Sequence, residues 1–107
     1  MVSFDEWSSM DLRVGLIEVV EEIEGKDKLY KLVVDFGEEK RTVVAGLKPF
    51  YTTEELTGKK SVFVYNLDSV TLGGVESQAM ILAAKNETDA YKIPLMDDSV
   101  PQGTKIE

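Results

Sequence analysis

Five short runs of β-branched and other apolar residues carry most of the apolar content of this chain. Each run is bounded by glycine, proline or charged residues, a pattern typical of strands and not of long helices. Gly15 interrupts the first run, as a bulge or a barrel corner requires. The runs predict strands over residues 12–20, 29–36, 41–45, 61–67 and 79–84.

The last of these runs is almost entirely apolar, so we expect a strand in the middle of the sheet. Gly73 and Gly74, which precede it, predict a mobile loop. Residues 91–96 predict a short edge strand, because Pro94 has no backbone donor for an inner position.

Two short helices are predicted outside these runs. Ser3 and Glu6 have the spacing of a capping box, and the apolar residues that follow Ser3 recur every three positions, which predicts a helix over residues 3–10. Thr52 or Thr53 can N-cap one helical turn that ends at Gly58.

The order of these elements predicts an all-β fold, a five-stranded OB-fold barrel with the helical turn between its third and fourth strands. A chain of 107 residues has room for one domain. We divide it into an N-terminal helix (1–10), the barrel (11–85) and a C-terminal extension (86–107).

The residue types that are missing argue against catalysis. The chain has no His and no Cys, so it lacks the commonest general base, the thiolate nucleophile and the preferred ligands of zinc. No nucleotide-binding, hydrolase or calcium-loop motif is present. We therefore expect a binding module that is not an enzyme and has no metal or cofactor.

The expected cellular location also follows from what the sequence lacks. No apolar run is long enough to cross a bilayer, and the acidic N-terminus does not have the pattern of a signal peptide. The lack of Cys suits the reducing cytoplasm, where we expect the protein to act without membrane contact.

The net charge of −8 disfavours a polyanionic partner, but the positive charges are concentrated. Eight of the 12 basic residues lie within residues 26–60, against six acids there. This distribution indicates either one less acidic face or lysines that simply solvate exposed strand edges.

Several separated motifs, in this order, carry a resemblance to a known family. They are Asp11-Leu12-Arg13-Val14-Gly15, Asp27-Lys28-Leu29-Tyr30, Arg41-Thr42-Val43-Val44-Ala45-Gly46-Leu47, Tyr51 to Lys60, Asn66-Leu67, and Gly74 to Ala84. Together they resemble the tRNA-binding domain found at the C-terminus of many methionyl-tRNA synthetases, in β-subunit-like chains and in stand-alone tRNA-binding proteins. The secretion chaperone CsaA is a more distant relative.

The resemblance implies an OB barrel, a homodimer, and contact with tRNA that depends on its shape and not on its sequence. The residues that match the tRNA-facing positions of the family are Lys28, Arg41, Asn66, Ser77, Gln78 and Met80. Cations suit phosphates, amide and hydroxyl groups suit sugars or base edges, and a thioether suits an exposed base.

A structural role is the alternative for some of these residues. Asn66 and Ser77 can satisfy backbone groups around a tight loop, and Met80 can belong to the core. Asp11 and Arg13 are expected to pair with each other or with backbone.

Apolar residues outside the strand pattern need cover, which predicts a dimer contact built from the N-terminal helix and the C-terminal extension. These residues are Phe4, Trp7, Ile93, Leu95 and Met96.

The main departure from the family lies in residues 68–74, which the family usually makes basic and which here hold no cation and one acid, Asp68. Two hypotheses follow. The chain is a tRNA-binding auxiliary or β-subunit of methionyl-tRNA synthetase, or it is a dimeric protein-interaction or chaperone-like module in which tRNA binding is weak or lost.

Overall fold

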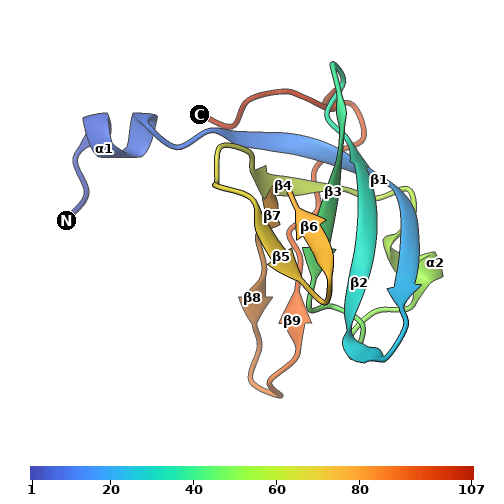
Figure 1. Ribbon diagram of the computed structural model, residues 1–107. Coiled ribbons are helices and arrows are strands. Elements are labelled where there is room, and N and C mark those ends of the chain that lie inside the picture. Colours follow the sequence, from blue (N-terminus) through green and yellow to red (C-terminus); the bar gives the residue numbers. More distant parts are fainter.

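The computed structural model describes residues 1–107, and most of its regular structure is antiparallel strand (Figure 1). Its elements in chain order are α1 (Phe4–Ser8), β1 (Leu12–Ile23), β2 (Lys26–Asp35), β3 (Lys40–Ala45), α2 (Thr53–Leu56), β4 (Lys60–Val64), β5 (Val70–Leu72), β6 (Val75–Ser77), β7 (Met80–Ile81), β8 (Ala84–Lys85) and β9 (Tyr91–Lys92). The main sheet has the strand order β3-β2-β1-β4-β7, and two small hairpins, β5-β6 and β8-β9, stand beside it.

Strand β1 bends so that its two halves have different partners. Leu12 to Leu16 pair with β4, whereas Leu16 to Ile23 pair with β2. An irregularity in the β2 pairing falls just after Ile17, and such bulges increase the local twist of a strand. At Gly15 a β-carbon would lie 2.5 Å from Val34 Cγ1, so only glycine allows the sheet to fold over itself here.

The core lies on the concave side of this bent sheet. Twelve buried residues form one cluster, and six of them, including Ile17, Leu32 and Phe63, have no exposed surface. Burying each such side chain contributes about 1.5–3 kcal/mol. The remaining members are Tyr30, Val34, Phe36, Val43, Ala45, Leu47, Leu56, Ala79 and Ile93.

Both predicted capping boxes are confirmed. The Oγ of Ser3 accepts a hydrogen bond from the N–H of Glu6, and Thr52 accepts one from the N–H of Glu55 in the same way. Helix α2 buries Leu56 in the core, whereas α1 buries no residue and projects from the sheet (Figure 1).

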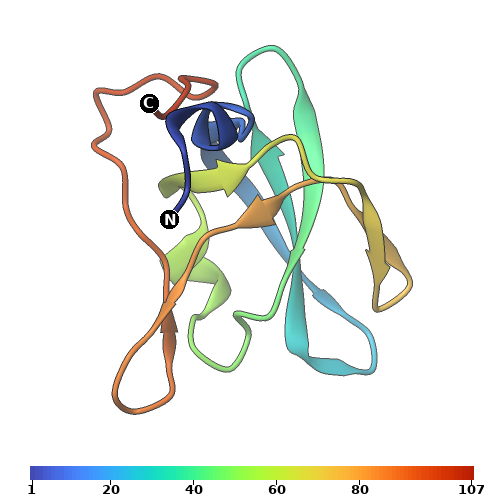
Figure 2. The same cartoon turned by 90° about the vertical axis from the view of Figure 1, so that its left-hand side faces the viewer.

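The C-terminal tail is bound along the chain's own sheet. The N–H of Val14 donates to Thr104 O at 2.9 Å, and Gly103 N–H and Ile106 N–H donate back to Val14 and Leu12 at 2.7 Å each. The tail thus pairs with the half of β1 that β2 leaves free, and its end lies beside α1 (Figure 2). The expected boundary between residues 85 and 86 falls inside the β8-β9 hairpin.

Two strand predictions are wrong in detail. The run 79–84 is not a central strand, because it is divided between Met80 and Ile81, which form an edge beside β4, and Ala84, which pairs with Lys92 of β9. Pairing in the run 91–96 stops at Lys92, the end of β9, whose partner is β8. The Gly73-Gly74 segment is a two-residue hairpin turn between β5 and β6, and both glycines have positive φ, as a type I′ turn requires.

Backbone pairing does not close the sheet into the expected barrel. Strands β3 and β7 are its two edges, and no ladder joins them. Two side chains cover the free edge of β3 instead. Ser77 Oγ accepts from Val44 N–H at 2.9 Å, and Gln78 Oε1 accepts from Thr42 N–H at 3.0 Å, while Gln78 N–H donates to Thr42 O at 2.8 Å. We call these contacts the β3 clasp.

No helix of the structure has both the length and the apolar character needed to span a bilayer.

Gly103→Ala tests the docking of the tail. Gly103 has φ +91°, and an added β-carbon would overlap the carbonyl oxygen of Phe36, so the free energy of unfolding should fall by about 3 kcal/mol in urea titrations. Gly25→Ala is the matched control, because Gly25 has φ +77° but open space around it; the expected loss there is about 1 kcal/mol. Equal losses at the two positions would mean that the tail is not packed as described.

Ser77→Ala tests the β3 clasp. The substitution leaves the buried N–H of Val44 without its acceptor, which should lower the free energy of unfolding by about 1–3 kcal/mol. Thr71→Ala, on the exposed strand β5 of the same hairpin, should change it by less than about 0.5 kcal/mol. A Ser77→Ala protein as stable as the original would contradict a structural role for this hydroxyl.

Candidate nucleic-acid interface

Arg41, at the start of β3, is held by three residues of its own chain. Its guanidinium lies 3.5 Å from the centroid of the Tyr65 ring, and Nη1 donates to Tyr65 O at 2.7 Å and to Gln78 O at 3.1 Å. Its Nε donates to Glu39 at 2.7 Å. Nη2 makes no hydrogen bond within the chain, so its two N–H groups remain available to an anion.

Tyr65 is contacted by a second arginine. Arg13 lies 4.1 Å from the same ring and forms two hydrogen bonds of 3.0 Å with Asp11, so the expected Asp11–Arg13 pair is confirmed. The hydrogen bond from Arg13 holds the pKa of the Asp11 carboxyl below its usual value. Burial, with the hydrogen bond to Glu39, raises the pKa of Tyr65. Two cations are thus neutralised by two nearby acids around one aromatic ring.

Asn66 joins this cluster to the segment that leads out of α1. Its Oδ1 accepts from Asp11 N–H at 2.9 Å, and its Nδ2 donates to Ser9 O at 2.8 Å. Like Ser77 and Gln78 in the β3 clasp, Asn66 therefore satisfies backbone groups of its own chain.

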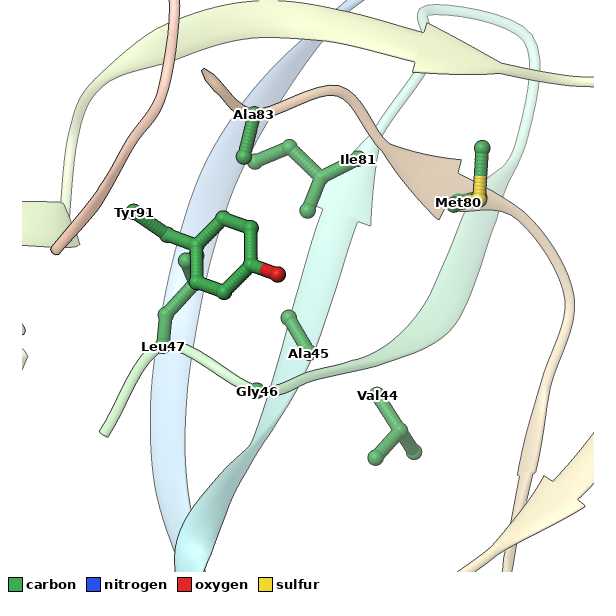
Figure 3. A pocket seen from close by; sticks show the side chains of 8 residues that line it. All are labelled: Val44, Ala45, Gly46, Leu47, Met80, Ile81, Ala83 and Tyr91. Carbon is green, nitrogen blue, oxygen red and sulfur yellow. The ribbon is translucent and has the colours of Figure 1, made fainter. Parts of the chain in front are cut away.

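Met80 is 48% exposed and is absent from the core cluster, so a core position for it is ruled out. It stands between two apolar hollows that also share Val44. The first hollow, about 240 Å³, is shown in Figure 3, where the side chains of Met80 and Tyr91 lie on opposite sides of it. Its lining is Val44, Ala45, Gly46, Leu47, Met80, Ile81, Ala83 and Tyr91.

The second hollow, about 130 Å³, lies between the sheet and the β5-β6 hairpin. Its lining is Val44, Leu67, Asp68, Val70, Leu72, Ser77, Ala79 and Met80. We call it the hairpin slot.

Three lysines without an ion pair lie on β2. Lys31 is the cross-strand partner of Val44, and the carbonyl of Lys28 lies beside Gly46, so both adjoin residues that line the hollows. Lys26 reaches the tip of the hairpin, where its Cγ is 3.4 Å from the β-carbon position of Gly73. None of the three is in an ion pair.

Apart from Asn66, which contacts Asp11 and Ser9, the predicted site residues lie along β3 or beside it. Arg41 and Gln78 are in direct contact at its start, Ser77 meets its middle at Val44, and Lys28 lies beyond its end at Gly46. Four of the six are already engaged with their own chain, and Lys28 and Met80 are the two that are free. The side chains of Asp and Glu form no group of three placed to hold a metal ion.

Tyr65 and Tyr91 are the residues that sequence reasoning missed. The two-residue period of a strand places Tyr65 on the same face as buried Phe63, and this signal was available in the run 61–67. Tyr91 had no such signal, because its position depends on the β8-β9 hairpin that brings it next to Phe50, with ring centroids 5.7 Å apart.

Comparisons with known proteins agree with this arrangement. The methionine–tRNA ligase of Methanococcus maripaludis is 45% identical over 106 residues, which are 99% of this chain and 16% of the ligase. The crystal structure of a MetRS-related protein from Pyrococcus horikoshii matches with a TM-score of 0.95 at 38% identity and covers 100% of this chain and 98% of that one. The crystal structure of chaperone CsaA from Bacillus anthracis matches with a TM-score of 0.89 at 28% identity. The match covers 100% of this chain and 99% of the chaperone chain.

This chain therefore spans 16% of the length of the Methanococcus maripaludis ligase. The family described as "Putative tRNA binding domain" matches residues 12–105, which run from the start of β1 to the docked tail. The chain belongs to this family of tRNA-binding domains.

Proposed function

We propose that this chain binds tRNA by shape and backbone contact and serves as an auxiliary or β-subunit of methionyl-tRNA synthetase. The observation that carries the proposal is the family match over residues 12–105, which contains all six candidate site residues and both hollows. A non-catalytic module of this kind would raise the concentration of tRNA at its synthetase partner in the cytoplasm.

The free groups along β3 and β2 suit this task. Lys28, with its neighbours Lys26 and Lys31, is available for phosphates, and Arg41 offers the two N–H groups of Nη2. Met80 presents an exposed thioether to an unstacked base. Asn66, Ser77 and Gln78 would contribute mainly by holding these groups in place, with their remaining lone pairs directed to sugars or bases.

The sheet itself is proposed to be an OB-type barrel in which the β3 clasp replaces a closing ladder. Side-chain acceptors at Ser77 and Gln78 satisfy the N–H groups of Val44 and Thr42, which a closing strand would otherwise pair. An unpaired strand edge can pair with the edge of another chain and so cause aggregation. The β3 clasp would protect β3 from such pairing.

A protein-interaction or chaperone-like function is the second candidate. The likeness to chaperone CsaA over the whole chain favours it, as does the apolar lining of both hollows beside a segment, 68–74, without cations. With a net charge of −8, tRNA binding would depend on few lysines and weaken quickly as salt is added.

We also propose a homodimer in which α1 contacts a second copy. Phe4 is 78% exposed and Trp7 40%, and with Met10 and Ile106 they line a hollow of about 330 Å³ beside the C-terminus. Of the remaining predicted interface residues, Leu95 is 66% exposed and Met96 is half-buried. Ile93 cannot take part as expected from the sequence, because it is buried in the core of its own chain.

Lys28→Ala tests tRNA binding. Removing one phosphate contact should reduce the slope of log affinity against log salt by about 0.7–0.9 and weaken binding at about 50 mM salt, as measured by fluorescence anisotropy with labelled tRNA. Lys59→Ala is the matched control, since Lys59 has no ion pair and lies next to α2, away from the β5-β6 hairpin (Figure 1). It should leave the slope unchanged. Failure of the original protein to bind tRNA at about 50 mM salt would overturn the proposal and leave the protein-interaction function.

Trp7→Ala tests the dimer. Truncating a large aromatic side chain at the centre of an interface typically weakens association by about 2 kcal/mol or more, or roughly thirtyfold. Sedimentation at about 20 µM should therefore show a dimer for the original protein and mostly monomer for the variant, whereas Val19→Ala, an exposed apolar residue on β1, should remain dimeric. A monomeric original protein at this concentration would contradict the assigned interface.

A further inference from the structure

The hairpin slot is an apolar space between two layers of the molecule. Val70 and Leu72 line it from the β5-β6 hairpin, and Val44, Ala79 and Met80 line it from the sheet side. Val70 is 51% exposed, Leu72 40% and Met80 48%, so the slot is open to solvent and its walls are not packed against each other. Its volume of about 130 Å³ is comparable with that of one flat heterocyclic ring system.

Two polar side chains line the slot, those of Ser77 and Asp68, and only one of them is free. Ser77 Oγ is buried and is occupied by Val44 N–H and Ala79 O. Asp68 is the only charged lining residue; it is exposed, and its carboxylate has no hydrogen bond or ion pair within the chain. The slot therefore combines two apolar walls with one unoccupied, negatively charged hydrogen-bond acceptor.

This combination selects among nucleic-acid groups. A phosphate is repelled by Asp68, whereas a base can stack between apolar side chains and donate an amino group to a carboxylate. Adenine, cytosine and guanine carry such an amino group. Uracil does not, and its N3–H is flanked by two carbonyl oxygens that a carboxylate repels.

Resting on the proposed function, we infer that the hairpin slot binds one unpaired nucleobase that carries an exocyclic amino group, with Asp68 accepting the hydrogen bond from that group. The lysines that flank the slot on β2, Lys26 and Lys31, are placed to hold the adjoining phosphates. This binding mode would explain why residues 68–74 hold no cation, because the segment would contact the edge of a base and not the phosphate backbone.

Oligocytidine and oligouridine of equal length give the cleanest test, because their bases have the same size and their phosphates are identical. We expect labelled eight-nucleotide oligocytidine to bind the full chain about five- to tenfold more tightly than oligouridine at low salt. The quantity to compare is the ratio of the two affinities, since any loss of an acid raises binding of both oligomers together.

Asp68→Asn should bring this ratio to within about twofold of one, because an amide can donate to uracil O4 as well as accept from cytosine N4. Glu76→Gln is the matched control. Glu76 lies on β6 of the same hairpin between Val75 and Ser77, so it faces away from the slot, and the ratio should stay as in the original protein.

Each outcome separates the two proposals. A ratio near one in the original protein, or a ratio unchanged by Asp68→Asn, overturns the base site while tRNA binding can stand. The same holds if oligocytidine does not bind at about 1 mM although tRNA binds. Shifts of the Met80 methyl resonance with an unfolded apolar peptide but not with oligocytidine would assign the slot to protein segments instead. If the original protein prefers oligocytidine to oligouridine but does not bind tRNA, the proposed function is overturned and the base site in the slot stands.

Discussion

The close approach of backbone at Gly15 is the constraint on which the rest of the molecule depends. Because no β-carbon separates β1 from Val34 and Phe63, β1 can bend and pair with β4 through its first half and with β2 through its second. The first half of β1, which does not pair with β2, is then free to bind the C-terminal tail, which docks through Gly103. The core, the sheet order and the position of the tail all follow from this one bend.

Polar side chains along β3 are divided between structure and binding. Ser77 and Gln78 satisfy the free edge of the sheet, Asn66 holds the entrance to β1, and Arg41 is stacked on Tyr65 with only Nη2 uncommitted. Buried polar groups that lose their partners are costly, so these residues are constrained by folding before any ligand arrives. The proposed ligand contacts therefore fall mainly to side chains with no internal partner, chiefly Lys28 and Met80.

The proposed binding surface is weakly basic for a nucleic-acid partner. Three lysines without an ion pair lie on β2, near the two apolar hollows and the tip of the β5-β6 hairpin, whereas Asp68 precedes this hairpin and Glu76 lies on it. Such a surface would depend on stacking and base contact more than on phosphate neutralisation, and its specificity would reside in the bases that it admits.

Local patterns determined much of this protein from the sequence alone: the strands β1 to β4, both capping boxes, the Asp11–Arg13 pair and, through ordered motifs, the family. Tertiary structure alone decided that the apolar run 79–84 is an edge, that Ile93 is core, that Met80 is exposed and that Ser77 and Gln78 cover β3. The reason is physical. Capping and strand period are set by neighbours in sequence, whereas burial and edge position depend on contacts between segments tens of residues apart, which no local pattern encodes.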